Sequence, residues 1–338
     1  MGHTLLRRAG LALGAFAAFT LPQAALGQVQ LESQFDRALG TELREPADYS
    51  ASYRNPLEMR IAQIADGSRG RIGVHAVDLA TGRTVSVLGD QRFPMASTSK
   101  IAIAATYLEG VDQGRWSLTS EFPLLWPLRS TPFSSRIAPV KAGEYMPARQ
   151  LIELMITRSS NPATDALLKA VGGPDAVNDW ARRAGIEEFN LSRDIATLVR
   201  DDGEFDPATV VDPRDSITPR AMVEMLTGLY QNKWLSTSSR NVLIGAMERT
   251  RTGTRRIKAN MPSDVLVAHK TGSLNNTSSD IGIITAPDGR SIAVAIYVTG
   301  QGAKLRREAK IAEIARALYD GYTSPRTVWT DAEFPNRR

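Results

Sequence analysis

Along the chain, the spacing of hydrophobic residues changes between helical and β-type, and this predicts where each element lies. From residue 56 to residue 65 apolar residues recur at helical spacing, and the pattern ends at Gly67, so we expect a helix there. Two short β-prone runs around Thr81 and Gly82 predict a hairpin. Far along the chain three more strands are predicted, over VLVAHKTGS, DIGIITAPDGR and SIAVAIYVTG, followed by a terminal amphipathic helix over KLRREAKIAEIARALYDGY.

Between Ser97 and Arg249 the spacing is almost entirely helical. Because an isolated hairpin is barely stable in water, the strands near the two ends of the chain must pair into one sheet. We therefore expect an α+β fold in which an antiparallel sheet from both chain ends is flanked by helices and carries an inserted all-helical lobe. The helices of that lobe are predicted over KIAIAATYLEGV, ARQLIELMITR, ATDALLKAVGG, AVNDWARRAG, PRAMVEMLTGLY and SRNVLIGAMER.

The roughly 310 residues that follow the predicted leader exceed what one hydrophobic core normally holds, so two lobes are expected. Residues 56–96 and 250–338 should form the α+β lobe, and residues 97–249 the helical lobe. The active-site cleft is expected between the two lobes. Residues 28–55 are polar and are interpreted as an N-terminal extension.

Residues 1–27 have the organisation of a secretory leader. Arg7 and Arg8 precede an apolar run that ends at Pro22, and small residues surround a cleavage point near Gly27. The run is too short for a membrane-spanning helix, so we expect no stable membrane anchor and a periplasmic or secreted protein. The paired arginines leave the export route open.

Composition and charge exclude several partners. The chain has 41 Lys and Arg against 36 Asp and Glu, and removal of the leader with its two arginines leaves 39 against 36, a net charge of +3. No basic run is interleaved with aromatic residues, so no nucleic-acid partner is expected. The densest basic stretch, from Arg249 to Lys258, is interpreted as a solvated helix end and turn. No coiled-coil seam is visible, which favours a monomer.

The chain lacks cysteine and has three histidines, which restricts its chemistry. His3 lies in the leader, so only His75 and His269 remain, and we expect no metal site. Without thiols, a covalent mechanism must use Ser, Thr, Lys or a carboxylate.

The first candidate motif is FPMASTSK, in which Ser97 lies three residues before Lys100 at the start of a predicted helix. Residues three apart share one face of a helix, so the lysine amine can approach the serine hydroxyl. If burial lowers its pKa, the amine can accept the hydroxyl proton. By itself this pattern is more typical of a helix N-cap followed by a surface lysine.

The second motif, Ser159-Ser160-Asn161, lies between two predicted helices. A loop there can direct a hydroxyl and an amide into a cleft, where Ser159 would relay a proton and Asn161 would hold an amide carbonyl. The alternative is a simple capping turn before Pro162. The same Ser-x-Asn pattern recurs at Ser239, so position decides its meaning.

The third motif, Lys270-Thr271-Gly272-Ser273, ends a predicted strand. Lys270, Thr271 and Ser273 offer a positive charge and hydroxyls to a substrate carboxylate, and Gly272 allows the substrate to approach the backbone. A similar run at 251–253, Arg-Thr-Gly, is interpreted as a helix stop.

These three motifs, in this order and on these elements, form the set found in class A beta-lactamases and penicillin-binding proteins. From about Pro56 to about Tyr322 the chain resembles the class A beta-lactamase family of penicillin-recognising serine hydrolases. The longer segments that look like those of the family are FPMASTSK, LIELMITRSSN, RDSITPRAMVEML, HKTGS and IGIITAPDGRSIAVAIYVTG.

The resemblance implies that Ser97 is acylated by a beta-lactam carbonyl with Lys100 as base. Ser159 would pass a proton to the departing nitrogen, and Lys270 would bind the substrate carboxylate. Backbone N–H groups of Ser97 and Ser273 would form the oxyanion hole. No cofactor is implied, and the ligand expected is a small beta-lactam or a peptidoglycan peptide. The implied substrate-binding residues are Asn161, Thr271, Gly272 and Ser273.

The chain departs from the family in the loop that normally supplies a glutamate to hydrolyse the acyl-enzyme. Counting forward from Gly185 puts Ile195 at that position, and counting back from Arg214 puts Asp202 there. Strand residue Asp280 also stands where many relatives carry an arginine that faces the substrate. The possible stand-ins for the glutamate are Asp194, Asp201, Asp202, Glu204 or none of them.

Three functions fit these observations. The first is a serine beta-lactamase that contributes to antibiotic resistance through an acyl-Ser97 intermediate. The second is a D,D-peptidase or esterase with the same nucleophile, which the missing glutamate favours. The third is a penicillin binder or sensor that deacylates slowly.

Overall fold

The computed structural model describes residues 55–66 and 69–324. The leader predicted at 1–27 and the extension predicted at 28–55, apart from Asn55, lie outside the described residues. No helix of the described part combines the length and the apolar composition that crossing a bilayer requires.

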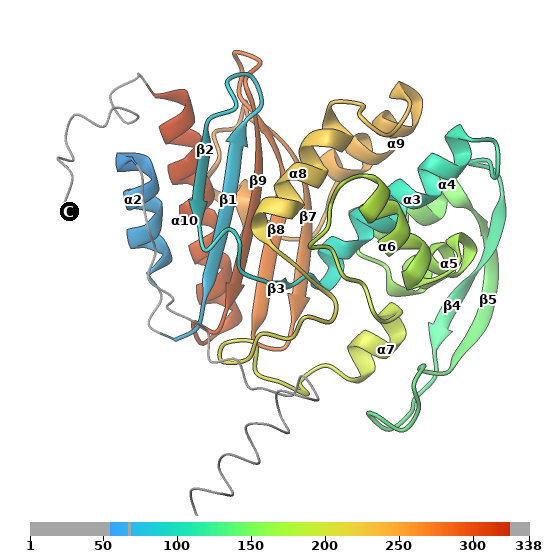
Figure 1. Ribbon diagram of the computed structural model, residues 1–338. Helices are drawn as coiled ribbons and strands as arrows, with labels where there is room; N and C mark the ends of the chain where they lie inside the picture. The colour runs from blue at the N-terminus through green and yellow to red at the C-terminus, as the bar shows by residue number, and fades with distance from the viewer. Residues whose placement is uncertain (1–54, 67–68, 325–338) are drawn as a thin grey trace, which may run out of the picture. The chain divides into compact units, whose positions relative to one another are not determined.

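A five-stranded antiparallel sheet is the centre of the fold (Figure 1), and its strands run in the order β2-β1-β9-β8-β7. The neighbours β1 and β9 come from the two ends of the chain, paired from Ile72 with Val298 to Asp78 with Ile292. The predicted α+β class with a sheet from both chain ends is therefore confirmed. The strands are β1 (Ile72–Asp78), β2 (Thr84–Val87), β7 (Leu266–Leu274), β8 (Thr277–Thr285) and β9 (Ser291–Thr299).

The two faces of the sheet bury different cores because side chains alternate along each strand. On β9, Val294 and Ile296 enter a core shared with helices α2 (Pro56–Ala65) and α10 (Lys304–Thr323). Figure 1 shows these two helices together on one side of the sheet. The predicted first and last helices are therefore confirmed.

On the other face, Ala293, Ala295 and Tyr297 of β9 join a larger core that is otherwise mostly helical. The 3-10 helix η1 (Ala96–Ser99) leads into this layer and packs against β7. The helices of the layer are α3 (Lys100–Asp112), α4 (Ala148–Thr157), α5 (Asn161–Val171), α6 (Pro174–Arg183), α8 (Pro219–Tyr230) and α9 (Thr237–Glu248).

One part of the all-helical prediction for residues 97–249 is wrong. Strands β4 (Glu121–Pro127) and β5 (Val140–Pro147) form an antiparallel hairpin whose buried Leu124 and Leu125 join the helical core. Both strands contain proline, and β5 also contains glycine, which local patterns count against a strand. The strands of a two-stranded sheet are both edge strands, where these residues are tolerated.

Four shorter elements were also not predicted. The two-residue strands β3 (Phe93–Pro94) and β6 (Ser216–Ile217) pair with each other. Helix α7 (Ile195–Arg200) interrupts the long loop after α6, and the 3-10 helix η2 (Ile257–Asn260) precedes β7. The division into two lobes at residues 96 and 250 remains a proposal, since one core includes both helices and a sheet face.

Candidate active site

Ser97 lies in η1, directly before α3, which begins at Lys100 as the apolar spacing predicted. The turn that holds Ser97 is a 3-10 turn and not the first turn of an α-helix. The preceding residue Ala96 has a φ of 49°, a left-handed conformation that is unusual for a residue with a side chain. Thr98 anchors the turn because its hydroxyl lies 3.1 Å from the Tyr297 hydroxyl of β9. The Ser97 hydroxyl, which is half-buried, makes no hydrogen bond within residues 55–66 and 69–324. It is therefore available to a substrate.

Gly272 brings strand β7 against η1. A Cβ atom at this position would lie 2.8 Å from the carbonyl oxygen of Met95 and 2.4 Å from the Ser279 hydroxyl. Any side chain would push the strand away from Ser97. The structure therefore gives Gly272 a packing role, in addition to the substrate approach that the sequence suggested.

Ser159 follows α4 and has a φ of 57°. Such strained backbone is maintained where surrounding contacts over-determine it, often at functional sites. The next residue, Ser160, caps α5 by accepting a hydrogen bond from the Ala163 N–H. The capping turn is therefore confirmed for Ser160. It is compatible with a functional role of the motif, because it leaves the side chains of Ser159 and Asn161 free for other partners.

The side chains of Lys100, Ser159, Asn161 and Lys270 form one hydrogen-bonded cluster. The Lys100 amine donates to the Ser159 carbonyl oxygen at 2.8 Å, to its hydroxyl at 3.2 Å and to Asn161 Oδ1 at 2.8 Å. The Lys270 amine donates to the Ser159 hydroxyl at 3.0 Å and to the Thr271 carbonyl oxygen at 2.8 Å. The Ser159 oxygen thus accepts from two amines, and its own O–H proton remains available for donation.

Both lysines of the cluster are fully buried, with no exposed surface. Burial penalises an ammonium and lowers the pKa of Lys100 to about 7, although the Asp165 charge opposes this shift. Burial and the neighbouring Lys100 charge lower the pKa of Lys270 well below its usual range. Near neutral pH the Lys100 amine therefore spends time in the neutral form, which can accept a proton.

The other two residues of the third motif have different environments. Thr271 is buried, and its hydroxyl lies 2.7 Å from that of Thr252. Residues 251–253, which were interpreted as a helix stop, therefore also contact the third motif through Thr252. Ser273 is exposed, and its hydroxyl accepts a hydrogen bond of 2.7 Å from Arg256 Nη2.

Arg256 was assigned to a solvated turn, and that interpretation is wrong. Its side chain is 3% exposed and donates to the carbonyl oxygens of Gly272 and Ser279 as well as to Ser273. Glu308 of α10 completes its environment with an ion pair of 3.1 Å. No local pattern identifies this role, because the guanidinium reaches β7 only through the tertiary fold.

Asp280 does not occupy a substrate-facing position. It is completely buried and pairs with His269, whose Nδ1 lies 2.9 Å from the carboxylate. It also accepts a hydrogen bond from the backbone N–H of Ile257 in η2. Asp280 therefore fixes internal structure beneath β7.

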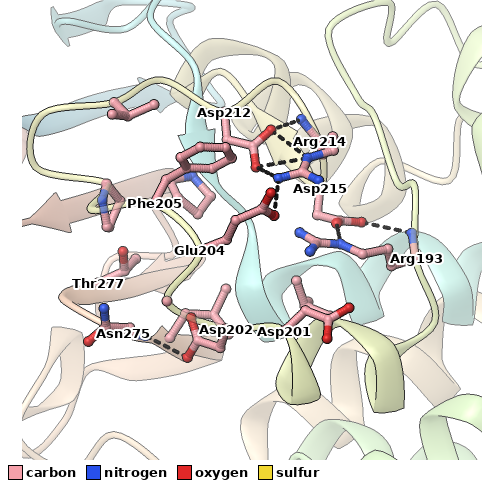
Figure 2. A pocket seen from close by; sticks show the side chains of 16 residues that line it. Arg193, Asp201, Asp202, Glu204, Phe205, Asp212, Arg214, Asp215, Asn275 and Thr277 are labelled. Atoms are coloured by element: carbon pink, nitrogen blue, oxygen red, sulfur yellow. Dashed lines mark hydrogen bonds and ion pairs between the residues drawn. The ribbon is translucent and has the colours of Figure 1, made fainter. Parts of the chain in front are cut away.

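The four loop acids proposed from the sequence are engaged away from the cluster. Figure 2 shows the region around three of them, with Glu204 paired to Arg214 and Asp202 accepting from the Asn275 N–H. Asp194 caps α7, and hydrogen bonds from Arg200 lower the pKa of Asp201 to about 2. Among the described residues, none of these carboxylates is hydrogen-bonded to Lys100, Ser159 or Lys270.

Asp165, which belongs to none of the three motifs, is 4% exposed and lies on α5. Its two carboxylate oxygens accept the backbone N–H groups of Ile195 at 2.8 Å and Ala196 at 2.9 Å. Burial raises its pKa to about 7. The available signal was its position four residues after Asn161, on the same helical face.

Comparisons with known proteins give a consistent result. Residues 56–322 match the model of the family described as "Beta-lactamase enzyme family". The chain is 29% identical to extended-spectrum beta-lactamase PER-1 of Pseudomonas aeruginosa, with 81% of this chain and 90% of that protein covered. It is 31% identical to beta-lactamase CTX-M-25 of Escherichia coli, with 79% and 90% covered.

A solved structure shares the architecture. The crystal structure of a beta-lactamase from Chitinophaga pinensis DSM 2588 superposes with a TM-score of 0.70 at 27% identity. The superposition covers 80% of this chain and 100% of that one. The similarity therefore extends through the elements that carry the cluster.

Proposed function

Because this chain belongs to the beta-lactamase enzyme family, we propose that it hydrolyses beta-lactams through an ester between Ser97 and the opened ring. The observation that carries the proposal is the Ser159 hydroxyl held between the buried amines of Lys100 and Lys270. Buried titratable groups with perturbed pKa values, such as these two amines, are typical of catalytic sites.

In the acylation step, the neutral Lys100 amine takes the Ser97 hydroxyl proton as the serine oxygen attacks the lactam carbonyl carbon. The carbonyl π electrons move to oxygen, and the backbone N–H groups of Ser97 and Ser273 stabilise the resulting charge. Loss of one such donor typically costs about 3 kcal/mol in the barrier. When the C–N bond breaks, Ser159 donates its proton to the departing nitrogen and is reprotonated from the lysines.

Substrate binding uses polar groups of the second and third motifs. Asn161 accepts from Lys100 through Oδ1, so its Nδ2 amide is available to hold a substrate carbonyl. The Lys270 amine and the hydroxyls of Thr271 and Ser273 supply hydrogen-bond donors for the substrate carboxylate, and an incoming carboxylate favours the charged form of the Lys270 amine. Arg256 adds a second positive charge behind Ser273. This arrangement suits a small anionic beta-lactam.

A D,D-peptidase, an esterase or a slowly deacylating penicillin binder is the second candidate. It is favoured by the loop acids, since Asp201 and Glu204 are neutralised by arginines and Ile195 is buried at the start of α7. Water would then lack a carboxylate base, and the ester would be long-lived. For either candidate function, we propose that the protein is exported to the periplasm or the exterior and is a monomer.

Hydrolysis of a chromogenic cephalosporin by the purified protein tests the first candidate against the second. We expect multiple turnovers that are lost in Ser97→Ala. Ser239→Ala is the matched control, because this serine repeats the Ser-x-Asn pattern but its hydroxyl bonds Asp112 in α3. A single burst without turnover, together with cleavage of a D-Ala-D-Ala peptide, would favour the second candidate.

A further inference from the structure

We propose that Asp165 is a positioning residue that controls the protonation of Lys100 while it joins α5 to the start of α7. The inference rests on the proposed function, in which Lys100 is the base. The carboxylate that acts on the lysines of the site would then come from helix α5 and not from the loop between residues 193 and 215.

Asp165 and the cluster are connected through α5. Asn161 begins this helix and accepts a hydrogen bond from the Lys100 amine, and Asp165 follows four residues later on the same face. Both side chains therefore project from adjacent turns of one rigid element. The helix therefore holds the Asp165 carboxylate in a fixed position relative to Asn161, which binds the Lys100 amine.

The Asp165 carboxylate is fixed in place and only partly compensated. Its oxygens accept the N–H groups of Ile195 and Ala196. Within the described residues no arginine or lysine donates to it, in contrast to Asp201 and Glu204 in the loop. A buried carboxylate of this kind retains a long-range electrostatic effect on neighbouring cations.

Three acceptors surround the Lys100 amine, namely both oxygens of Ser159 and Oδ1 of Asn161. An ammonium fills this arrangement with all three of its protons. A buried ammonium at Lys100 is stabilised by a nearby negative charge. The Lys270 amine on β7 cannot provide this charge, because an amine is either neutral or positive. Asp165 is the carboxylate whose charge opposes deprotonation of Lys100.

The remaining charges around this pair come from neighbouring elements. Asp194, before α7, raises the pKa of Asp165, and the Lys100 charge lowers it. On the β7 side, Asp280 and Arg256 act on Lys270 with opposite signs. Lys100 is therefore balanced between burial, which favours the neutral amine, and Asp165, which favours the ammonium.

The sign of the effect follows from this balance. Asp165→Asn removes the charge that favours the ammonium, so the pKa of Lys100 falls further. Loss of an opposite charge disfavours the ammonium form of a buried amine. Because burial also raises the pKa of Asp165 to about 7, only part of this charge is present at the midpoint of the acid limb. The acid limb of the acylation rate should therefore move to lower pH by less than a full charge would produce, and the rate on the plateau should fall because a weaker base accepts the proton.

The acylation rate constant is measured by stopped flow with a chromogenic cephalosporin between pH 4.5 and 9. The control variant is Asp194→Asn, which keeps an N-cap residue on α7 and leaves Asp165 in place. We expect the acid limb to move down only in Asp165→Asn. An unmoved limb in Asp165→Asn, or the same downward shift in Asp194→Asn, would overturn the proposal.

A second readout does not depend on acylation. Carbon-13 NMR of lysine labelled at Cε follows the titration of Lys100, identified by its loss in Lys100→Met. The midpoint should fall in Asp165→Asn, or in Asp165→Ser if the first variant does not fold. Reciprocally, the carboxyl carbon of Asp165 should titrate at higher pH in Lys100→Met. Midpoints that do not move in either direction would refute the coupling even in an active enzyme.

Discussion

The catalytic cluster and the long loop between Arg193 and Asp215 treat charge in opposite ways. In the loop, Glu204 and Asp212 both pair with Arg214, and Asp215 pairs with Arg193. In the cluster, two buried amines are held by hydroxyl and carbonyl oxygens. Charges with a direct ionic partner hold the loop in place and stay ionised near neutral pH, whereas the buried amines without one have pKa values lowered toward the range in which they can transfer protons.

Exposure accounts for much of this difference. Arg214 and Glu204 are 39% and 33% exposed, and solvent screens such pairs so that each contributes little to stability. Lys100 and Lys270 are shielded from solvent completely. Burial of these amines is unfavourable for folding, but the same burial lowers their pKa values, on which proton transfer at the site depends.

Replacement of Lys100 by Met should have the largest effect in the cluster. The methionine is nearly isosteric but cannot accept a proton, so the acylation rate constant should fall by about a thousandfold. Stopped-flow acylation with a chromogenic cephalosporin measures this loss. Lys169→Met, on the exposed surface of α5, is the control and should retain the wild-type rate. An equal loss in both variants would remove the distinction between the cluster and the surface.

Arg256 tests the same contrast through stability. Its guanidinium is buried beside Glu308, so Arg256→Met leaves an uncompensated buried carboxylate and should lower the free energy of unfolding by about 3 kcal/mol. Arg249→Met breaks an exposed pair with Glu153 and should cost less than about 1 kcal/mol. Urea denaturation compares the two variants. Similar losses in both would contradict the assignment of Arg256 to the interior.

The loop should give the smallest effect. Glu204→Gln removes one of two carboxylates on Arg214 and should change the free energy of unfolding by less than about 1 kcal/mol. Because this carboxylate is bound to an arginine, the deacylation rate should stay within about twofold of wild type, far below the hundredfold that loss of a base produces. A large fall in deacylation would identify Glu204 as the base and reverse the comparison.

The sequence predicts the regular part of the fold well. The strands around Ile72 and Ile292 contain dense β-branched residues, and the helices have clear apolar spacing and caps, so local pattern and tertiary structure agree. The β4–β5 hairpin could not be predicted in this way. Its proline-containing strands are stabilised by packing on α5, which no local pattern encodes.

The site was predictable to the extent that its motifs are contiguous. Lys100, Ser159 and Lys270 belong to short patterns, and the structure joins them by hydrogen bonds. Asp165 and Arg256 belong to none. Their importance arises from burial next to a distant element, and a single sequence contains no record of which surface a charged residue will face.

Intact-protein mass spectrometry at timed intervals after mixing with penicillin tests the central claim most directly. The account predicts that the wild-type chain gains the mass of one whole penicillin, since ring opening releases no fragment, and then returns to its original mass. Ser97→Ala should gain nothing. An adduct of the same mass on Ser97→Ala, or the absence of any adduct and any hydrolysis with the wild type, would contradict it.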